Sequence, residues 1–189
     1  MRLVLRERRA ALDPDEQAAA SMAVMARLAR LPVLDEATVV AGYRAVRGEV
    51  DLDGALALLG ARGTLVTVPR VVGDDLEFLP WSPDAADTAG SFGIREPVAG
   101  EAVPFGRHTV VLAPLVAFDR TGQRLGQGGG FYDRAISGAG DHRPVMIGVA
   151  HAFQEVERVP AEPWDQRLDA VITEDETIEF RPGATGPGR

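Results

Sequence analysis

Residues 37–68, ATVVAGYRAVRGEVDLDGALALLGARGTLVTV, decide the fold. Ala37 to Tyr43 is a short apolar run that predicts a buried strand, and Thr64 to Val68 predicts a second strand that stops at Pro69. Between them, Asp51 to Ala61 predicts a helix closed by Gly63. The inward face of this helix holds Leu52, Ala55, Leu56 and Leu59. A strand, a helix and a strand in this order are typical of an α/β sheet covered on both faces.

The chain before this unit is predicted to be helical. A short basic helix covers Arg2 to Ala11. A second helix begins after Asp13, which can cap it, because Pro14 suits the first helical position and Glu16 lies three residues after the cap. We expect this helix to end at Pro32. The residues expected on its inward face are Ala18, Met22, Met25 and Ala29.

The chain after this unit continues the alternation. Further strands are predicted at Leu76–Leu79, Thr109–Leu112, Val145–Val149 and Ala170–Thr173, and a helix begins at Phe131–Ile136. The segment Gly73–Arg107 is rich in Pro, Gly and Asp and is expected to be less regular. We expect one domain over residues 1–180 and a disordered tail over residues 181–189.

Composition places the chain among ordinary soluble globular proteins. Of its 189 residues 46% are hydrophobic and 25% charged, which suits one domain with a sizeable core. There is no cysteine, which excludes disulfides, thiolate metal sites and cysteine nucleophiles. A net charge of −8 argues against non-specific nucleic-acid binding. The charged N-terminus and the absence of long apolar runs argue against a signal peptide and a membrane span, so we expect a cytoplasmic enzyme.

The strongest functional signal is residues 113–134, APLVAFDRTGQRLGQGGGFYDR, which contain five glycines. Glycine weakens strands and helices, but it lets backbone N–H groups approach a ligand closely. With Arg124 beside them and a helix after them, these glycines indicate an anion site, and we expect phosphate as the ligand.

Two standard phosphate loops do not match. No Gly-Lys-Ser/Thr follows, as a Walker loop requires, and the third glycine of a dinucleotide fingerprint is misplaced. A flexible surface loop stays open as the alternative. Asp119 to Gly122 is interpreted as a simple turn.

Several side chains are candidates for the site. Asp133 beside a phosphate loop could hold Mg²⁺, or it could form a salt bridge. Asp165 and Asp169 could complete a metal site or be ordinary surface acids. Glu49 follows the first strand and could accept hydrogen bonds from an amine or amidine edge, or be a first-turn acid of the next helix. Arg70 could meet a phosphate or be solvated.

Two other classes of site are disfavoured. The three histidines, His108, His142 and His151, share no metal-ligand spacing. No serine lies in a nucleophile-elbow pattern.

These residues together resemble the 5-formyltetrahydrofolate cyclo-ligase family, also called 5,10-methenyltetrahydrofolate synthetases, over nearly the whole chain. The central match is Phe118-Asp119-x-x-Gly122-x-Arg124-Leu125-Gly126-x-Gly128-Gly129-Gly130-Phe131-Tyr132-Asp133-Arg134. Weaker matches are Arg2-x-x-Leu5-Arg6, Gly48-Glu49, Val68-Pro69-Arg70, Phe92-Gly93-Ile94-Arg95-Glu96-Pro97 and the run from Asp165 to Glu174.

The resemblance implies a three-layer α/β/α fold with a central, mostly parallel mixed sheet of the NagB/RpiA/CoA-transferase-like type. It implies that ATP, with Mg²⁺, phosphorylates the formyl oxygen of 5-formyltetrahydrofolate. Attack by N10 and loss of phosphate then leave 5,10-methenyltetrahydrofolate, ADP and phosphate. The protein would mainly position these groups and neutralise their charge.

The resemblance also assigns residues. ATP would be contacted by Arg2, Arg6, Arg124, Leu125, Gly126, Gln127, Gly128, Gly129, Gly130, Phe131 and Tyr132, of which Arg124, Gly128 and Tyr132 would be catalytic. Mg²⁺ would be held by Asp133 and Asp165. The folate would be bound by Glu49, with Phe92 beside it, and by Gln127, Gly128, Gly129, Gly130 and Phe131, which would lie between the two substrates.

This chain departs from its relatives in the loop. Some relatives have a basic residue where this chain has Gln127 or Gly129, so backbone N–H groups, Arg124 and Mg²⁺ must suffice here. Tyrosine is common in place of Phe131, so no hydroxyl role is implied there. Two other functions stay open: a sugar-phosphate isomerase or CoA-transferase-like enzyme, and a non-catalytic folate- or nucleotide-binding protein. We expect a monomer.

Overall fold

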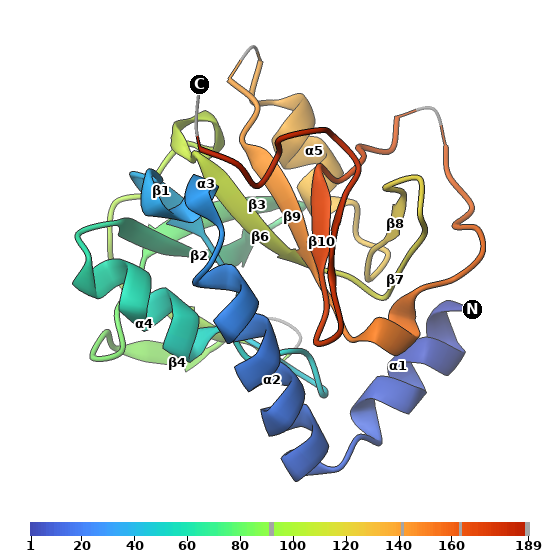
Figure 1. Ribbon diagram of the computed structural model, residues 1–189. Helices are drawn as coiled ribbons and strands as arrows, with labels where there is room; N and C mark the ends of the chain where they lie inside the picture. Colours follow the sequence, from blue (N-terminus) through green and yellow to red (C-terminus); the bar gives the residue numbers. More distant parts are fainter. Residues whose placement is uncertain (91–92, 141, 163, 188–189) are drawn as a thin grey trace.

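A seven-stranded mixed sheet forms the centre of the protein (Figure 1). The computed structural model describes residues 1–90, 93–140, 142–162 and 164–187. The strand order is β11-β10-β9-β6-β1-β2-β3. All neighbouring pairs from β10 to β2 are parallel, and the two edge strands β11 and β3 pair antiparallel to their neighbours. The expected α/β class with a mostly parallel sheet is confirmed.

The sheet strands follow the predicted order along the chain. They are β1 (Val39–Ala41), β2 (Leu65–Val72), β3 (Asp75–Pro80), β6 (Val110–Pro114), β9 (Val145–Val149), β10 (Ala170–Ile172) and β11 (Thr177–Glu179). Two small hairpins add β4 (Asp87–Ala89) with β5 (Arg95–Pro97), and β7 (Ala117–Phe118) with β8 (Arg124–Leu125). The helices are α1 (Arg2–Ala10), α2 (Pro14–Leu28), α3 (Pro32–Asp35), α4 (Asp53–Ala61) and α5 (Phe131–Ser137).

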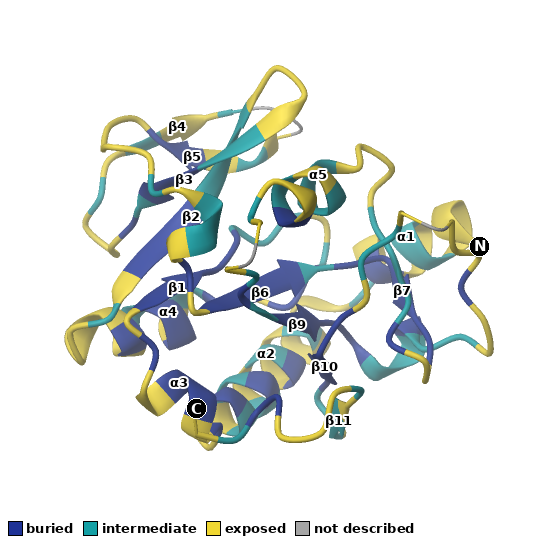
Figure 2. Cartoon of the chain, turned by 90° about the horizontal axis from the view of Figure 1, so that it is seen from above, coloured by how far each residue is buried: buried dark blue, intermediate teal, exposed yellow. Residues whose placement is uncertain are grey.

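The helices cover the sheet from two sides, which confirms the three layers. Seen from above, α2, α3 and α4 lie below the buried central strands and α5 lies above them (Figure 2). One apolar cluster joins α2, α3 and α4 to the sheet, and it includes Val24, Leu34 and Leu56. A second cluster joins α5 to the other face, with Ile136 packed among residues such as Val111 and Met146. Among the described residues, no helix combines the length and apolar character needed to cross a membrane.

The expected inward face of α2 is wrong. Ala18, Met22 and Ala29 are exposed and Met25 is only partly buried. The residues that face the core are Ala20, Val24 and Leu28. The sequence offers two apolar stripes on this helix, and packing on the sheet uses the stripe with the branched Val24 and Leu28. The cap is confirmed, since the Asp13 side chain accepts a hydrogen bond from the Asp15 N–H.

Two expectations about proline are also wrong. Pro69 does not end the second strand, because β2 continues to Val72 and pairs Pro69 with Phe78. The carbonyl of Thr67 faces β1, and the pairing of β1 with β2 ends at this residue. Pro69 lies two residues later and has the same side toward β1, beyond the end of that strand. The N–H that Pro69 lacks would therefore have no neighbouring strand to bond. Pro32 does not end α2 either, because that helix stops at Leu28 and Pro32 begins α3.

Part of the C-terminal segment lies against the body of the protein. Ala184 and Thr185 are buried, and the Thr185 carbonyl accepts a hydrogen bond from the Val33 N–H. The Thr185 hydroxyl also bonds Glu179 on β11. Residues 188 and 189 of the expected disordered tail lie outside the described residues.

Candidate active site

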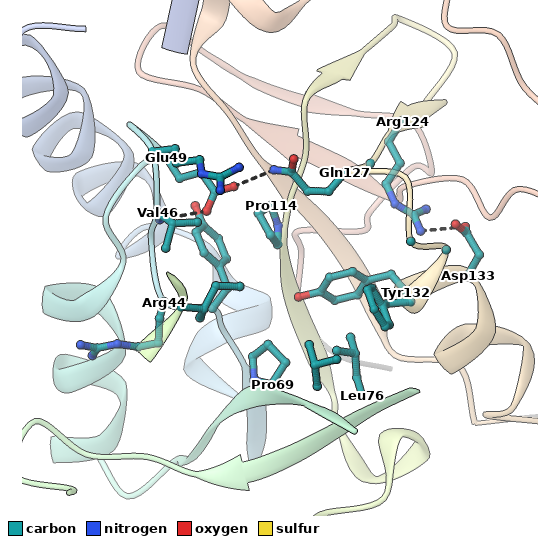
Figure 3. Close-up of a pocket in the computed structure, with 18 of the residues that line it drawn as sticks. Arg44, Val46, Glu49, Pro69, Leu76, Pro114, Arg124, Gln127, Tyr132 and Asp133 are labelled. Atoms are coloured by element: carbon teal, nitrogen blue, oxygen red, sulfur yellow. Dashed lines mark hydrogen bonds and ion pairs between the residues drawn. The ribbon is translucent and has the colours of Figure 1, made fainter. Parts of the chain in front are cut away.

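A cavity of about 420 Å³ opens where several strands of the sheet reach their carboxyl ends. Tyr43 follows β1, Pro69 lies on β2 and Pro114 is the last residue of β6, and all three line it. The opposite wall is the glycine loop with the first turn of α5 (Figure 3). Ligands of open α/β sheets gather at this edge. The volume is in the range of small-molecule sites.

Glu49 reaches the cavity from a tight turn that follows β1. The turn runs from Val46 to Glu49 and is closed by a 3.1 Å hydrogen bond from the Glu49 N–H to the Val46 carbonyl. Its central residues, Arg47 and Gly48, both have positive φ angles, +51° and +76°, as a mirror-image turn requires. The alternative that Glu49 is a first-turn acid is wrong, because α4 begins only at Asp53.

The Glu49 carboxylate is buried but well partnered. It pairs with the Arg9 guanidinium at 3.0 Å, and it accepts hydrogen bonds from the Val46 N–H at 3.2 Å and from the Gln127 side chain at 3.1 Å. Burial raises the pKa of Glu49, and the charge of Arg9 opposes that rise. A buried carboxylate that remains ionised is a strong acceptor for a ligand that carries paired N–H donors.

The glycine loop offers backbone donors to the cavity. Gly128 and Gly130 have φ angles of +111° and +65°, a conformation that side-chain-bearing residues rarely adopt. Within the part of the chain that the structure describes, the N–H groups of residues 127–130 have no hydrogen-bond partner. Successive free N–H groups in such a loop form a site for phosphate oxygens.

Arg2 supports the same loop from α1. Its Nε atom donates to the Gly126 carbonyl at 2.9 Å, and its guanidinium lies beside Gly128. A side chain at Gly129 would collide with the ring of Phe131, which lines the cavity. Position 129 thus has little room for a larger residue.

Arg124 and Asp133 form an ion pair at the far side of the cavity (Figure 3). The two side chains meet at 2.8 Å, and the Asp133 oxygen in that pair also accepts from the Gln166 N–H at 3.2 Å. Arg124 in turn donates to the Gln166 carbonyl. These contacts join the loop, α5 and the segment before β10 in one charged cluster. The other Asp133 oxygen has no partner among the described residues.

The acidic residues differ in their fitness to hold a metal. Asp133 lines the cavity, whereas Asp165 lies off the cavity and accepts a hydrogen bond from the Glu162 N–H. Asp169 is neither a metal ligand nor a surface acid, because it is buried and pairs with Arg143 and Arg181. Among the described residues, no group of three possible ligands gathers. Mg²⁺ often uses only one or two carboxylates and completes its shell with phosphate and water, so Asp133 fits such a site.

Tyr132 points its hydroxyl toward the middle of the cavity, between Glu49 and the Arg124–Asp133 pair (Figure 3). This oxygen is buried and has no partner in the described chain. Burial and, to a lesser extent, the charge of Glu49 raise the pKa of Tyr132. The hydroxyl is therefore protonated at neutral pH and can donate to a substrate oxygen.

Two arginines are left to neutralise an anionic ligand. Arg6 and Arg47 line the cavity, and neither forms an ion pair with a described residue. Arg70 is not a simple solvated arginine, because it pairs with Glu77 at 2.6 Å, and it does not line the cavity. Phe92, expected beside the folate, lies outside the described residues.

Two histidines, His108 and His151, form hydrogen bonds within the fold. The His108 ring lies 2.8 Å from the Thr67 hydroxyl and 2.9 Å from the Phe105 carbonyl. His151 contacts the Gly48 carbonyl at 2.8 Å. Burial lowers the pKa of both rings, so both are neutral at pH 7.

Arg9 was not among the predicted site residues, although the sequence holds a signal for it. Arg2, Arg6 and Arg9 follow at spacings of four and three and therefore share one face of α1. No role was predicted for Tyr43 and Glu96, which line the cavity. Tyr43 lies in an apolar segment and Glu96 in an irregular one, and in such segments the sequence alone does not show which way a side chain points.

Comparison with known proteins shows similarity over nearly the whole chain. The profile of the 5-formyltetrahydrofolate cyclo-ligase family matches residues 1–174. The 5-formyltetrahydrofolate cyclo-ligase of Escherichia coli K12 is 34% identical over 182 residues, which cover 94% of this chain and 100% of the relative. That of Haemophilus influenzae is 32% identical, covering 91% of this chain and 95% of the relative. The NMR structure of Aquifex aeolicus 5,10-methenyltetrahydrofolate synthetase superposes with a TM-score of 0.83 at 34% identity, covering 96% of this chain and 92% of that one.

Proposed function

The chain belongs to the 5-formyltetrahydrofolate cyclo-ligase family, and we propose that its cavity holds ATP and the folate on opposite sides of the glycine loop. Its activity is the cyclisation of 5-formyltetrahydrofolate to 5,10-methenyltetrahydrofolate. With this activity, the two alternative functions are set aside: a sugar-phosphate isomerase or CoA-transferase-like enzyme, and a non-catalytic folate- or nucleotide-binding protein. One observation carries the arrangement: one cavity holds buried Glu49, the Arg124–Asp133 pair, and a loop whose four N–H groups lack a partner among the described residues.

ATP lies on the side of Arg124. Backbone N–H groups of residues 127–130 face its phosphates, and Arg6 and Arg124 neutralise their charge. Arg2 holds the loop through Gly126. Mg²⁺, when bound, draws charge from the phosphate oxygens, and Asp133 would hold it.

Asp165 joins the metal site only after a change of side-chain rotamer, since it now caps its own turn at Glu162. It lies next to Gln166, which bonds Asp133, so its backbone is already close to the metal ligand.

The folate lies on the side of Glu49. The pterin ring of 5-formyltetrahydrofolate presents neighbouring amine and ring N–H donors, which a carboxylate accepts as a pair. Gln127 of the loop and Phe131 at the start of α5 line this part of the cavity. Tyr43 and Pro69 add an apolar surface for the ring.

The chemistry follows from this placement. The formyl oxygen of an amide is a poor leaving group, and transfer of the γ-phosphoryl group to it makes a good one. N10 of the folate attacks the formyl carbon and releases its proton to solvent, and the carbon–oxygen bond breaks with release of phosphate. The Tyr132 hydroxyl donates a hydrogen bond to an oxygen at the reacting centre. The loop excludes water and side chains from the path between the substrates.

An isotope experiment tests this route. The folate is prepared with ¹⁸O in its formyl group and converted with ATP and Mg²⁺, and the released phosphate is analysed by mass spectrometry. The route predicts one ¹⁸O atom in each phosphate, because the formyl oxygen leaves with the phosphoryl group. Label that appears in water instead excludes phosphorylation of the formyl oxygen.

Two further expectations remain proposals. We expect the protein to act as a monomer, because one chain supplies every residue of the proposed site. We expect it to act in the cytoplasm, which agrees with a chain without cysteine.

A further inference from the structure

Arg9 is the most deeply buried charged side chain next to the cavity. It is 2% exposed and lies on α1, the helix that also carries Arg2 and Arg6. Every nitrogen of its guanidinium has a partner. Nε donates to the Arg47 carbonyl at 3.2 Å, one terminal nitrogen donates to the Leu115 carbonyl at 3.1 Å, and the other pairs with Glu49 at 3.0 Å.

Arg9 holds the turn that carries Glu49 at two points, a central residue and the last one. It holds the backbone at Arg47 and the carboxylate at Glu49, while the His151 ring holds the Gly48 carbonyl from another side. Gly48 has no room for a side chain, since a Cβ there would lie 2.0 Å from the Arg9 carbonyl oxygen. The turn and α1 therefore fit against each other closely, and the direction of Glu49 depends on Arg9.

Among the described residues, Arg9 is the sole cation paired with Glu49. The other titratable or charged groups around the turn and the cavity are Tyr43, Arg44, Arg47 and Asp51 on its own segment, Arg6 on α1, Arg124, Tyr132 and Asp133 on the loop and α5, Asp74 and Glu96 across the cavity, and His151 after β9. A carboxylate buried without a partnered cation tends to take up a proton.

We propose that Arg9 is a positioning residue for the folate, whose guanidinium keeps the Glu49 carboxylate ionised and directed into the cavity. The proposal rests on the proposed role of Glu49 as the acceptor for the pterin donors. When Glu49 is protonated, its carboxyl group accepts fewer hydrogen bonds, and its O–H donor would face the N–H donors of the pterin. Burial raises the pKa of Glu49, and the charge of Arg9 opposes this rise. Removal of Arg9 should therefore move the protonation of Glu49 toward neutral pH.

The variant Arg9→Gln tests this role, because glutamine keeps a donor for the Leu115 carbonyl and removes the charge. The folate KM is measured from about pH 6 to pH 8 at saturating ATP. We expect the KM to rise roughly tenfold per pH unit below the new pKa of Glu49, because one protonation controls binding. The wild type changes less than about threefold, and kcat at saturating folate stays within about threefold, because the effect is on binding.

Three companion variants isolate the cause. Arg9→Lys restores a cation and is expected to restore the flat pH profile. Arg9→Gln combined with Glu49→Gln removes the titrating group, so its folate KM is high at every pH without a slope. Arg8→Gln changes the neighbouring, exposed arginine of the same helix and leaves the profile as in the wild type. If the folate KM of Arg9→Gln depends on pH no more steeply than that of the wild type, the proposal is overturned.

The kinetics of the wild type, Arg9→Gln and the single variant Glu49→Gln separate the role of Arg9 from the proposed function and from the role of Glu49. An inactive wild type contradicts the proposed function. A normal folate KM in Glu49→Gln contradicts only the role of Glu49. A raised KM in Glu49→Gln with no pH slope in Arg9→Gln contradicts only the role of Arg9. If Arg9→Gln does not fold, carbon-13 titration of the Glu49 carboxyl in the wild type decides, and a carboxyl that titrates between about pH 6 and pH 8 refutes the proposal.

Discussion

Replacement of Gly48 by alanine tests how tightly the Glu49 turn is built against α1. Gly48 has a φ angle of +76°, and a Cβ at this position would lie 2.0 Å from the carbonyl oxygen of Arg9 and 2.8 Å from its carbonyl carbon. Both atoms belong to backbone, so no side chain can swing away to make room. Either the turn or the helix must move.

The size of the effect follows from two contributions. An alanine at positive φ costs about 1–2 kcal/mol, offset by about 0.4–1 kcal/mol from the less flexible unfolded chain. Steric overlap in a packed region costs about 1–3 kcal/mol more. We therefore expect Gly48→Ala to lower the free energy of unfolding by about 2–4 kcal/mol, and to raise the folate KM at least about tenfold because Glu49 moves with the turn.

Gly63→Ala is the matched control. Gly63 also has a positive φ angle, +94°, but no atom lies within 4 Å of the Cβ position. Its expected loss is about 1 kcal/mol, with a normal folate KM. Urea unfolding and steady-state kinetics of both variants provide the comparison. Equal losses of stability, or a normal folate KM in Gly48→Ala, would refute the close fit of turn and helix.

Further predictions concern charge. Arg124→Ala and Asp133→Ala should each lower kcat by about 10²–10³-fold while the fold survives, because each removes charge stabilisation at the phosphates; near-normal rates with an unchanged circular dichroism spectrum argue against that role. Glu49→Gln should raise the folate KM about tenfold or more and leave the ATP KM within about twofold, and the reverse pattern would show that the substrates are exchanged. Burial of Asp119 acts to raise its pKa, but hydrogen bonds from Thr121, Val159 and Gln123 outweigh it and leave the pKa lowered. Its contribution to stability is thus complete above about pH 4 and lost as the pH falls through the folded pKa, so Asp119→Asn should lose less stability than the wild type between about pH 4 and pH 2 in urea unfolding.

Much of the fold could be predicted because apolar runs and breakers agree along the chain. The order of strands and helices from Val39 to Ile172 follows the periodicity, and Asp13 and Pro14 mark the start of α2 as expected. The inward face of α2 could not be predicted, because residues 18–29 are apolar on two sides and only the sheet selects one. The extent of β2 through Pro69 likewise depends on where the neighbouring β1 ends.

Some residues of the candidate site could be predicted from the sequence and others could not. The glycine loop was visible because few structural roles explain four glycines between Arg124 and a helix. Glu49 was visible from its place after the first strand. The partner of Glu49 was not, because Arg9 lies 40 positions earlier and reaches it only through the docking of α1. Long-range pairing of this kind is set by tertiary structure and leaves in the sequence only the spacing of arginines along one helix face.

We propose that this cavity uses ATP to close the folate ring. To test this, the protein is incubated with 5-formyltetrahydrofolate, ATP and Mg²⁺, and methenyl absorbance in the near ultraviolet is followed while ADP is measured in parallel. We expect one ADP for each methenyl product, and no product when ATP is omitted. Product formation without ATP, or ADP formation without the methenyl product, would contradict it.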